Sequence, residues 1–168
     1  QKVKDEIFKR YKKLPENIFV IGSENSISTY TFAGICEPLI IYATKMGMEF
    51  SPLGQKVICA GESYIKNKDI TMDPNTKEEY FKILDQIPFK EKLSEGKINR
   101  AKLYAYHFFF RRTIAPAVLD EKKGKWPPFS INSQIYEVLE KNGDKQLKQI
   151  VNSIINNEPF IYNDEKNV

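Results

Sequence analysis

The chain has 168 residues, a length that suits one compact domain, and its 41% hydrophobic residues are enough for a core. Together with 12% aromatic residues, this hydrophobic fraction means that disorder throughout the chain is not expected. With 26 Lys and Arg against 22 Asp and Glu, the formal net charge is +4. No run reaches the roughly 18 apolar residues of a membrane span, and the first residues lack the apolar stretch of a secretory signal. We therefore expect a cytoplasmic protein.

The positive charge is concentrated in two zones. Residues 1–13 carry six basic and two acidic groups, and residues 97–125 carry eight basic and two acidic groups. The second zone suits phosphate or an anionic membrane surface. Because no RNP, KH or helix-turn-helix pattern accompanies it, we expect no nucleic-acid partner. Two cysteines and one histidine, without ligand spacing, predict no metal site and a reducing compartment.

The N-terminal region predicts a helix within residues 1–16 and then a strand. Residues 17–22, NIFVIG, form a short β-rich apolar run that ends at a glycine, which indicates a buried strand. A polar stretch follows and predicts the start of a short helix that reaches about residue 36. The N-cap candidates of this helix are Asn25, Ser26 and Ser28.

Two further apolar runs, at 39–43 and 56–60, predict strands, and a short helix is expected between them at 47–53, ended by Gly54. Strands that are apolar on both faces and alternate with helices are typical of a parallel sheet covered on both sides. The sequence therefore predicts an α/β fold. The expected architecture is a Rossmann-like three-layer unit with a short parallel sheet, followed by several C-terminal helices.

The remainder, residues 62–168, is predicted to be mainly helical. Thr76 and Glu79 match a capping box at the start of one helix, which Pro88 closes. We expect a single domain over residues 1–168, with residues 17–61 as its sheet core. The predicted helices of this part are 78–87, 93–112, 130–141 and 144–156.

The loop after the second predicted strand is the sharpest candidate site. Ligands of open α/β sheets bind beyond the carboxyl ends of the strands, and a helix N-terminus attracts phosphate. Thr44 offers a hydroxyl, Lys45 a cation and Gly47 a close backbone approach. Glu49 offers a carboxylate that can accept from ribose hydroxyls. The alternative is that Gly47 is a turn glycine and Glu49 complements the helix dipole.

The other two loops are predicted to reach the same edge of the sheet. Ser28 and Thr29 follow the first predicted strand, and their alternative role is helix capping. Glu62 and Tyr64 follow the third predicted strand, and their alternative is an ordinary turn between strand and helix. Three loops at one edge form a site more convincingly than any one of them alone.

The aromatic helix at 93–112 carries the last candidates for phosphate or acceptor contacts. His107 is the only histidine, and a lone histidine among aromatic residues is more often a core residue than a catalyst. Arg111 and Arg112 can bind phosphate in bidentate fashion, or can solvate the helix end and complement its dipole. Cys36 and Cys59 have no base in a known pattern, so neither is predicted to be a nucleophile.

Four pieces of sequence carry a family resemblance: SENSISTY, IIYATKMGME with PLGQKVICAGESY, DITMDPNTKEEYFKIL and YAYHFFFRR. In this order they resemble the C-terminal part of bacterial capsule polysaccharide biosynthesis proteins, over residues 17–112. These proteins are GT-B-type glycosyltransferase relatives that include the capsular Kdo transferases. The resemblance implies a donor-nucleotide site with no cofactor or metal, the donor being a CMP- or UDP-linked sugar. The implied contacts are Thr44, Lys45, Gly47 and Glu49, with Ser28 and Thr29 nearby.

The chain also departs from the family pattern. Thr44 stands where the family has Ser and Lys45 where it has Thr, while Glu49 is retained. The change at Lys45 bears on nucleotide preference. In this family the acceptor site and the catalytic base come from an N-terminal domain with a His-Pro motif, which these residues do not contain. The resemblance therefore assigns no catalytic residue here, and we expect no sugar transfer by the chain alone.

The leading function predicted by the sequence is the nucleotide-sugar-binding part of a glycosyltransferase in capsule or surface polysaccharide biosynthesis. Its partners would be a nucleotide sugar and a glycan or glycolipid acceptor. The alternative is a non-catalytic α/β interaction module, or a fragment, that forms a homodimer through an exposed sheet edge. A third hypothesis is peripheral contact with the inner membrane through the basic helices.

Overall fold

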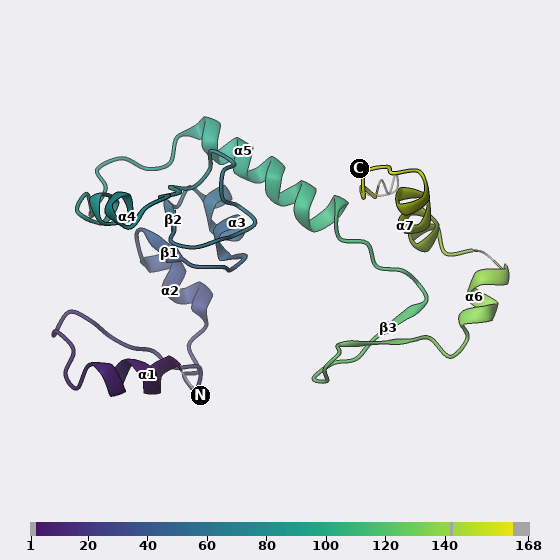
Figure 1. The fold of residues 1–168 in the computed structure, drawn as a ribbon, viewed down its shortest axis with the longest axis horizontal. Helices are drawn as coiled ribbons and strands as arrows, with labels where there is room; N and C mark the ends of the chain where they lie inside the picture. The colour runs from purple at the N-terminus through teal and green to yellow at the C-terminus, as the bar shows by residue number, and fades with distance from the viewer. Residues whose placement is uncertain (1–2, 142, 163–168) are drawn as a thin grey trace. The chain divides into compact units, whose positions relative to one another are not determined.

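The computed structural model describes residues 3–141 and 143–162 (Figure 1). Helices and strands are mixed, and two short sheets are present in these residues, one parallel and one antiparallel. The chain folds as two compact units, Gln1–Glu37 and Pro38–Val168. Within the described ranges, none of the helices combines the length and the apolar character that a bilayer crossing needs.

The first unit holds helix α1 (Val3–Arg10) and helix α2 (Thr29–Ile35). Ser28 is the N-cap of α2, and its Oγ accepts from the backbone N–H of Tyr30 at 3.2 Å. This confirms the predicted helix and one of its three capping candidates. An ion pair of 2.7 Å between Lys4 Nζ and Glu24 Oε1 ties α1 to the segment that leads toward α2.

The strand predicted at residues 17–22 is wrong. These residues form extended and turn backbone without strand pairing, and Phe19 is 82% exposed. The N–H of Ile18 donates to the carbonyl of Pro15, so the chain turns as the apolar run begins. A strand exists only where a neighbouring strand completes its hydrogen bonds. The described part of the first unit has no such neighbour, which a local apolar pattern cannot reveal.

The second unit is built on a parallel sheet of β1 (Leu39–Ile41) and β2 (Val57–Cys59), as predicted for both segments. The register pairs Leu39 with Val57. On its other side, β2 meets Met72 in a parallel bridge, with both Cys59 N to Met72 O and Met72 N to Val57 O at 2.9 Å. All three residues of β2 are buried, so the centre of this sheet is covered on both faces.

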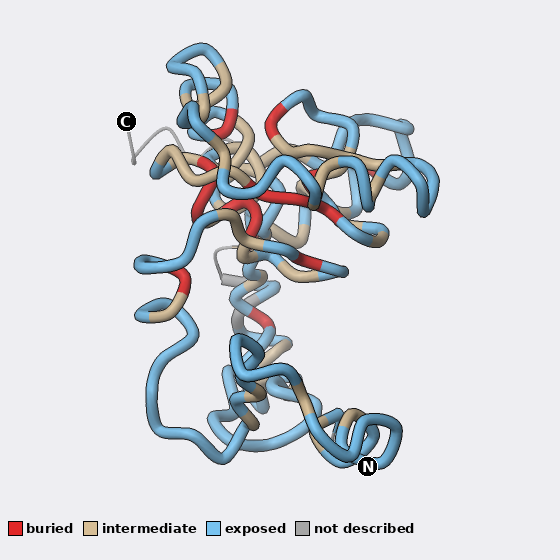
Figure 2. The backbone as a smooth tube through the Cα atoms, turned by 90° about the vertical axis from the view of Figure 1, so that its left-hand side faces the viewer, coloured by how far each residue is buried: buried red, intermediate tan, exposed pale blue. Residues whose placement is uncertain are grey.

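Helix α3 (Met46–Phe50) and the 3₁₀ turn η1 (Ser51–Leu53) connect the two strands. Gly54 ends the turn at φ +91°, a left-handed conformation that glycine adopts without strain. This confirms the predicted helix and its terminating glycine. The hydrophobic core lies between the sheet, α3 and the later helix α5 (Glu95–Tyr106), and its buried positions are red in Figure 2. The core residues are Ile41, Met48, Val57, Cys59, Ile65, Ile70 and Ala101.

Two helices follow the sheet, α4 (Lys77–Leu84) and α5 (Glu95–Tyr106). At the start of α4, Glu79 N donates to Thr76 Oγ1 at 3.1 Å, which confirms the predicted cap. The Glu79 carboxylate reaches back to Asn75 N at 2.7 Å instead of to the N–H of the cap residue. Helix α5 continues as a π-helical segment, η2 (His107–Arg111), so the predicted long helix is present but changes its winding.

The C-terminal part contains a hairpin that the sequence prediction missed. Strands β3 (Leu119–Glu121) and β4 (Phe129–Ile131) pair in antiparallel fashion, and α6 (Ile135–Lys141) and α7 (Lys145–Ile155) follow. The helix predicted from residue 130 therefore begins five residues later. Its first residues are used for pairing with β3, a non-local interaction that a helical pattern does not report. The final helix agrees with the prediction.

Candidate functional site

The carboxyl ends of the parallel strands meet at one edge of the sheet. There the N–H of Ala60 donates to the carbonyl of Ile41 at 2.8 Å, so the chain leaving β2 stays beside the end of β1. Asp73 follows Met72, the residue that extends the sheet on the other side of β2. Three connecting segments therefore start at this edge, the place where open α/β sheets bind ligands.

The segment after β1 carries Thr44, Lys45 and Glu49 into the start of α3. Thr44 Oγ1 accepts from the N–H of Met46 at 3.4 Å, and the side chain of Lys45 makes no capping bond. Lys45 Nζ lies 3.3 Å from Glu49 Oε1, one helical turn away. The Lys45 side chain is 61% exposed and that of Glu49 only 17%, so the cation faces solvent while the carboxylate is held against the protein.

Gly47 has a packing role in this structure. It is buried, and a Cβ placed on it would lie 2.7 Å from Ile41 Cδ1, 3.1 Å from Ile65 Cγ2 and 3.6 Å from Val57 Cγ1. Glycine at this position therefore lets α3 lie directly on the sheet. The predicted alternative, a turn glycine, does not describe it, because Gly47 lies inside the helix. A ligand contact at Gly47 stays a prediction.

The segment after β2 lies against the segment after β1. Ser63 Oγ donates to the carbonyl of Thr44 at 3.5 Å. At Gly61 a Cβ would lie 2.6 Å from Tyr42 Cδ2 and 2.9 Å from the carbonyl of Tyr42, so only glycine permits this approach. The two predicted loops are thus brought together, and Ser63 and Tyr42 are the contacts that join them.

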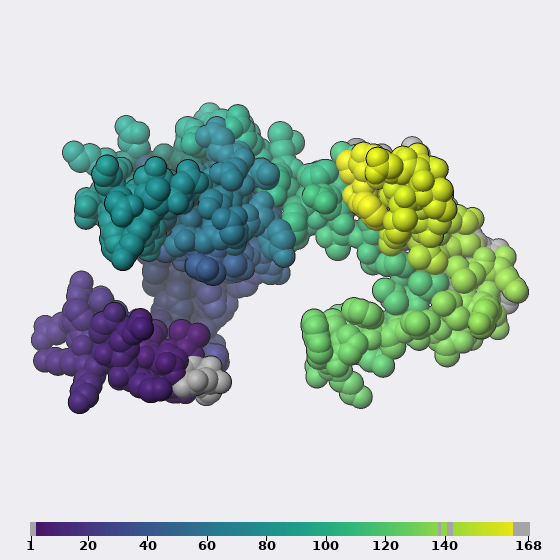
Figure 3. Space-filling view, viewed as in Figure 1, coloured from purple at the N-terminus to yellow at the C-terminus, as the bar shows by residue number. Residues whose placement is uncertain are grey.

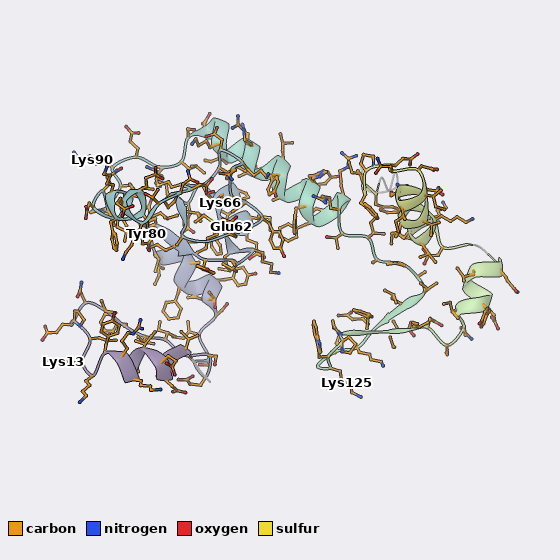
Figure 4. All side chains as sticks on the ribbon, in the orientation of Figure 1. Lys13, Glu62, Lys66, Tyr80, Lys90 and Lys125 are labelled. Carbon is orange, nitrogen blue, oxygen red and sulfur yellow. The ribbon has the colours of Figure 1, made fainter. Side chains whose placement is uncertain are left out.

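Glu62 points into solvent at this edge. Its side chain is 91% exposed, and its Oε1 pairs at 3.0 Å with Nζ of Lys66, whose side chain is 13% exposed. Figure 4 labels both residues. The hydrogen bond from Lys66 to Glu62 raises the pKa of Lys66. Lys66 is therefore a second cation near the predicted site, one that the sequence motifs did not single out.

Tyr64 connects the sheet edge to helix α5 and the segment that follows it. Its ring centroid lies 5.3 Å from that of Phe108, and the hydroxyl of Tyr104 donates to the carbonyl of Tyr64. Burial raises the pKa of Tyr104, and the charge of Arg112 opposes this increase. Tyr104 and Phe108 were missed as site residues. The available signal was their spacing of four residues, which places both on one helix face.

The basic end of this helix lies around η2. His107 and Arg111 are partly buried and Arg112 is exposed. The carbonyl of Arg111 accepts from the N–H of Tyr162 at 2.7 Å, which joins η2 to the chain after α7. Of the three predicted residues, Arg112 is the one whose charge acts on Tyr104, a residue that touches the sheet edge.

Ser28 and Thr29 belong to the first unit, not to the unit that contains the parallel sheet. Ser28 caps α2 and Thr29 is the first residue of that helix, so the capping alternative describes what Ser28 does here. The loop in which they were expected followed a strand that is not formed. A site shared by these two residues and Thr44 therefore stays a prediction.

The two cysteines have different environments. Cys36 is exposed and Cys59 is buried in β2. The Cys59 thiol donates to the carbonyl of Gly61 at 3.1 Å, and burial raises its pKa, so the reactive thiolate is disfavoured. Within residues 3–141 and 143–162, no group of three or more His, Cys, Asp or Glu side chains is placed to hold a metal ion.

A hollow lies at the other edge of the sheet, near the amino end of β2. Three lysines, Lys56, Lys92 and Lys97, line it together with Ser94, the N-cap of α5. Lys56 Nζ already lies 4.7 Å from the ring centroid of Phe89, and Lys97 Nζ lies 3.0 Å from Asp69 Oδ1. Because this hollow lies away from the carboxyl ends of the strands, where open α/β sheets bind ligands, we assign no ligand to it.

No family model, curated protein or solved structure matches this chain.

Proposed function

We propose that the segments following β1 and β2 form the donor-nucleotide site of a capsule-type glycosyltransferase, within a Rossmann-like sheet. The observation that carries the proposal is the hydrogen bond from Ser63 Oγ to the carbonyl of Thr44, because it joins two motif-bearing segments at the carboxyl edge of a parallel sheet. The resemblance to capsule polysaccharide biosynthesis proteins supplies the substrate class, a CMP- or UDP-linked sugar.

The Lys45–Glu49 pair suggests how a nucleotide is bound. An exposed lysine gains more from a phosphate than from a partly screened carboxylate, so a diphosphate draws Lys45 away from Glu49. The Glu49 carboxylate then accepts from ribose hydroxyls. Lys66, on the segment after β2, is paired with Glu62 and supplies a second cation when a phosphate displaces that carboxylate. The site binds and orients the donor. The resemblance implies that a separate N-terminal domain carries out the sugar transfer.

Calorimetric titration with CMP, CDP and UDP tests this assignment. We expect binding of the diphosphates, and we expect Glu49→Gln to weaken it about 10-fold, the cost of a hydrogen bond to a charged group. Glu78→Gln is the matched control, because Glu78 is an exposed glutamate on α4. Equal binding by wild type and Glu49→Gln, or no binding of any nucleotide, contradicts the proposal.

A second variant tests the phosphate contacts separately from the nucleoside contacts. Lys45→Gln is expected to weaken CDP or UDP but not the parent nucleoside, since Lys45 is assigned to phosphate alone. Loss of nucleoside affinity in this variant would show that the ribose and phosphate contacts are assigned to the wrong residues.

The alternative function, an interaction module that dimerises through a sheet edge, is favoured by one feature of β1. Among the described residues, β1 pairs with β2 on one side and with no strand on the other. Ile40, at the centre of β1, is 49% exposed. An unpaired strand edge beside an exposed aliphatic residue favours pairing with a second chain.

A further inference from the structure

The hairpin β3–β4 presents a basic loop with an exposed tryptophan. Residues 122–128, KKGKWPP, connect the strands, and Lys122 N donates to Pro128 O at 2.8 Å to close the loop. Gly124 turns the chain at φ +71°. Trp126 is 91% exposed, and in Figure 4 Lys125 lies at the tip of the hairpin.

The charge of the hairpin is polarised toward this loop. Lys122, Lys123 and Lys125 are exposed and make no ion pair with any residue that the structure describes. The two acidic residues of the hairpin lie in β3, before the loop, and Asp120 Oδ1 already accepts from Asn132 Nδ2 at 2.9 Å. The loop therefore carries three positive charges and no negative one.

One face of the hairpin carries three exposed apolar side chains and the carboxylate of Glu121. In the antiparallel register Leu119 is opposite Ile131 and Glu121 is opposite Phe129, which places these four side chains on the same face. Leu119, Phe129 and Ile131 are 38%, 50% and 69% exposed. In Figure 3 the atoms of the hairpin, light green, form a narrow body. The hairpin therefore has exposed apolar side chains along its strands, with Glu121 among them, and positive charge at its loop.

We propose that this hairpin docks on the surface of an anionic lipid bilayer, with Trp126 in the headgroup region and the three lysines against anionic headgroups. Tryptophan prefers the membrane interface, where its apolar ring and its N–H are both satisfied. Lysines near a negatively charged leaflet add an attraction of about 5-fold in partitioning per residue. The proposal is independent of the nucleotide site, because the hairpin contributes no residue to it.

A bilayer explains this surface better than the other anionic partners. Single-stranded nucleic acid is bound by grooves with several stacking aromatics, whereas the loop offers one. An acidic protein partner would explain the lysines but not an exposed aromatic ring in the loop together with exposed apolar side chains on the strands. An anionic membrane interface can bind the lysines, the exposed tryptophan and the exposed apolar side chains at the same time.

The chain has a single tryptophan, so its fluorescence reports directly on the loop. With vesicles of phosphatidylglycerol and phosphatidylcholine we expect a blue shift of the emission, protection from aqueous quenchers and co-sedimentation. Vesicles of phosphatidylcholine alone should give much less. An unchanged emission spectrum with the anionic vesicles overturns the proposal, as does equal binding to both vesicle types.

Charge variants test which lysines are responsible. Replacing Lys122 and Lys123 with Gln is expected to lower partitioning about 25-fold, from about 5-fold for each lysine. The matched control replaces Lys12 and Lys13, two exposed lysines of the first unit, and removes the same net charge. If the control weakens binding equally, net charge alone causes adsorption and the assignment to the hairpin fails.

A third variant tests the ring itself. Trp126→Ala is expected to lower co-sedimentation while the far-UV circular dichroism is unchanged, since Trp126 is almost fully exposed. Vesicle binding at the wild-type level by a folded Trp126→Ala variant would overturn the role of the tryptophan. Competition of vesicle binding by RNA, with the same change of emission, would reassign the surface to nucleic acid.

Discussion

At the edge of the sheet, residues of the same sequence motif have different roles: some pack against the protein and others are candidates for binding a ligand. Gly47 and Gly61 both occur in motif segments, and both are required by close contacts within the protein, with Ile41 and Tyr42 respectively. Lys45 is exposed and makes no capping bond, so a ligand can compete with Glu49 for its ammonium group. The glycines therefore shape the site, and the charged side chains are its candidates for recognition.

At Gly47 we predict that substitution by Ala destabilises the protein by about 1–3 kcal/mol, the usual cost of overpacking a core. The new methyl group would meet Ile41 Cδ1 at 2.7 Å, and Ile41 is buried and has little room to move. Urea unfolding followed by circular dichroism measures the change. Gly96→Ala on α5 is the control, since its Cβ meets nothing within 4 Å.

For Gly96→Ala the expected change is a gain of about 0.4–1 kcal/mol, because alanine restricts the unfolded chain. A Gly47→Ala variant as stable as the wild type would mean that α3 does not lie on the sheet as described.

Among the elements, those of the C-terminal part are joined by a buried carboxylate. Asp144 is 3% exposed and is the N-cap of α7, where its Oδ1 accepts from Leu147 N at 3.0 Å. Its Oδ2 accepts from Val118 N at 3.2 Å, just before β3. One side chain therefore caps a helix and fixes the segment that enters the hairpin.

We predict that Asp144→Ala lowers the free energy of unfolding by about 2–3 kcal/mol, since it removes a cap worth about 1 kcal/mol and leaves the buried Val118 N–H unsatisfied. Thr76→Ala is the comparison, because Thr76 caps α4 through one hydrogen bond. We expect that variant to lose only about 1 kcal/mol. Thermal unfolding of both variants measures the difference, and equal losses would argue against the bond to Val118.

At the scale of the whole molecule, one side of β1 pairs with no strand in the described part of the chain, which has a consequence for association. We predict that the chain self-associates at high concentration and that Ile40→Lys suppresses this, because a lysine on an edge strand opposes strand pairing. Size-exclusion chromatography with light scattering measures the mass. Leu103→Lys is the control, since Leu103 is 72% exposed and belongs to helix α5, not to a strand.

A wild-type protein that is monomeric at all concentrations would remove the alternative function. Equal dissociation by both variants would show that the contact is a general hydrophobic one.

The elements that could be predicted from the amino-acid sequence are those whose signals are local. Gly54 ends η1, and Thr76, Ser28 and Asp144 begin helices, because capping and left-handed glycine conformations depend on a few neighbouring residues. The strands β1 and β2 were also predicted, since their runs are apolar throughout, as buried parallel strands are.

Which apolar or polar runs find partners depends instead on the tertiary fold. Residues 17–22 look like β1 in sequence but have no strand neighbour among the described residues, whereas residues 129–131 pair with β3 and so delay α6. The contacts of the candidate site are of the same kind: Ser63 reaches Thr44 across 19 residues and Tyr104 reaches Tyr64 across 40. Strand pairing and site assembly depend on hydrogen bonds between distant segments, which no local pattern contains.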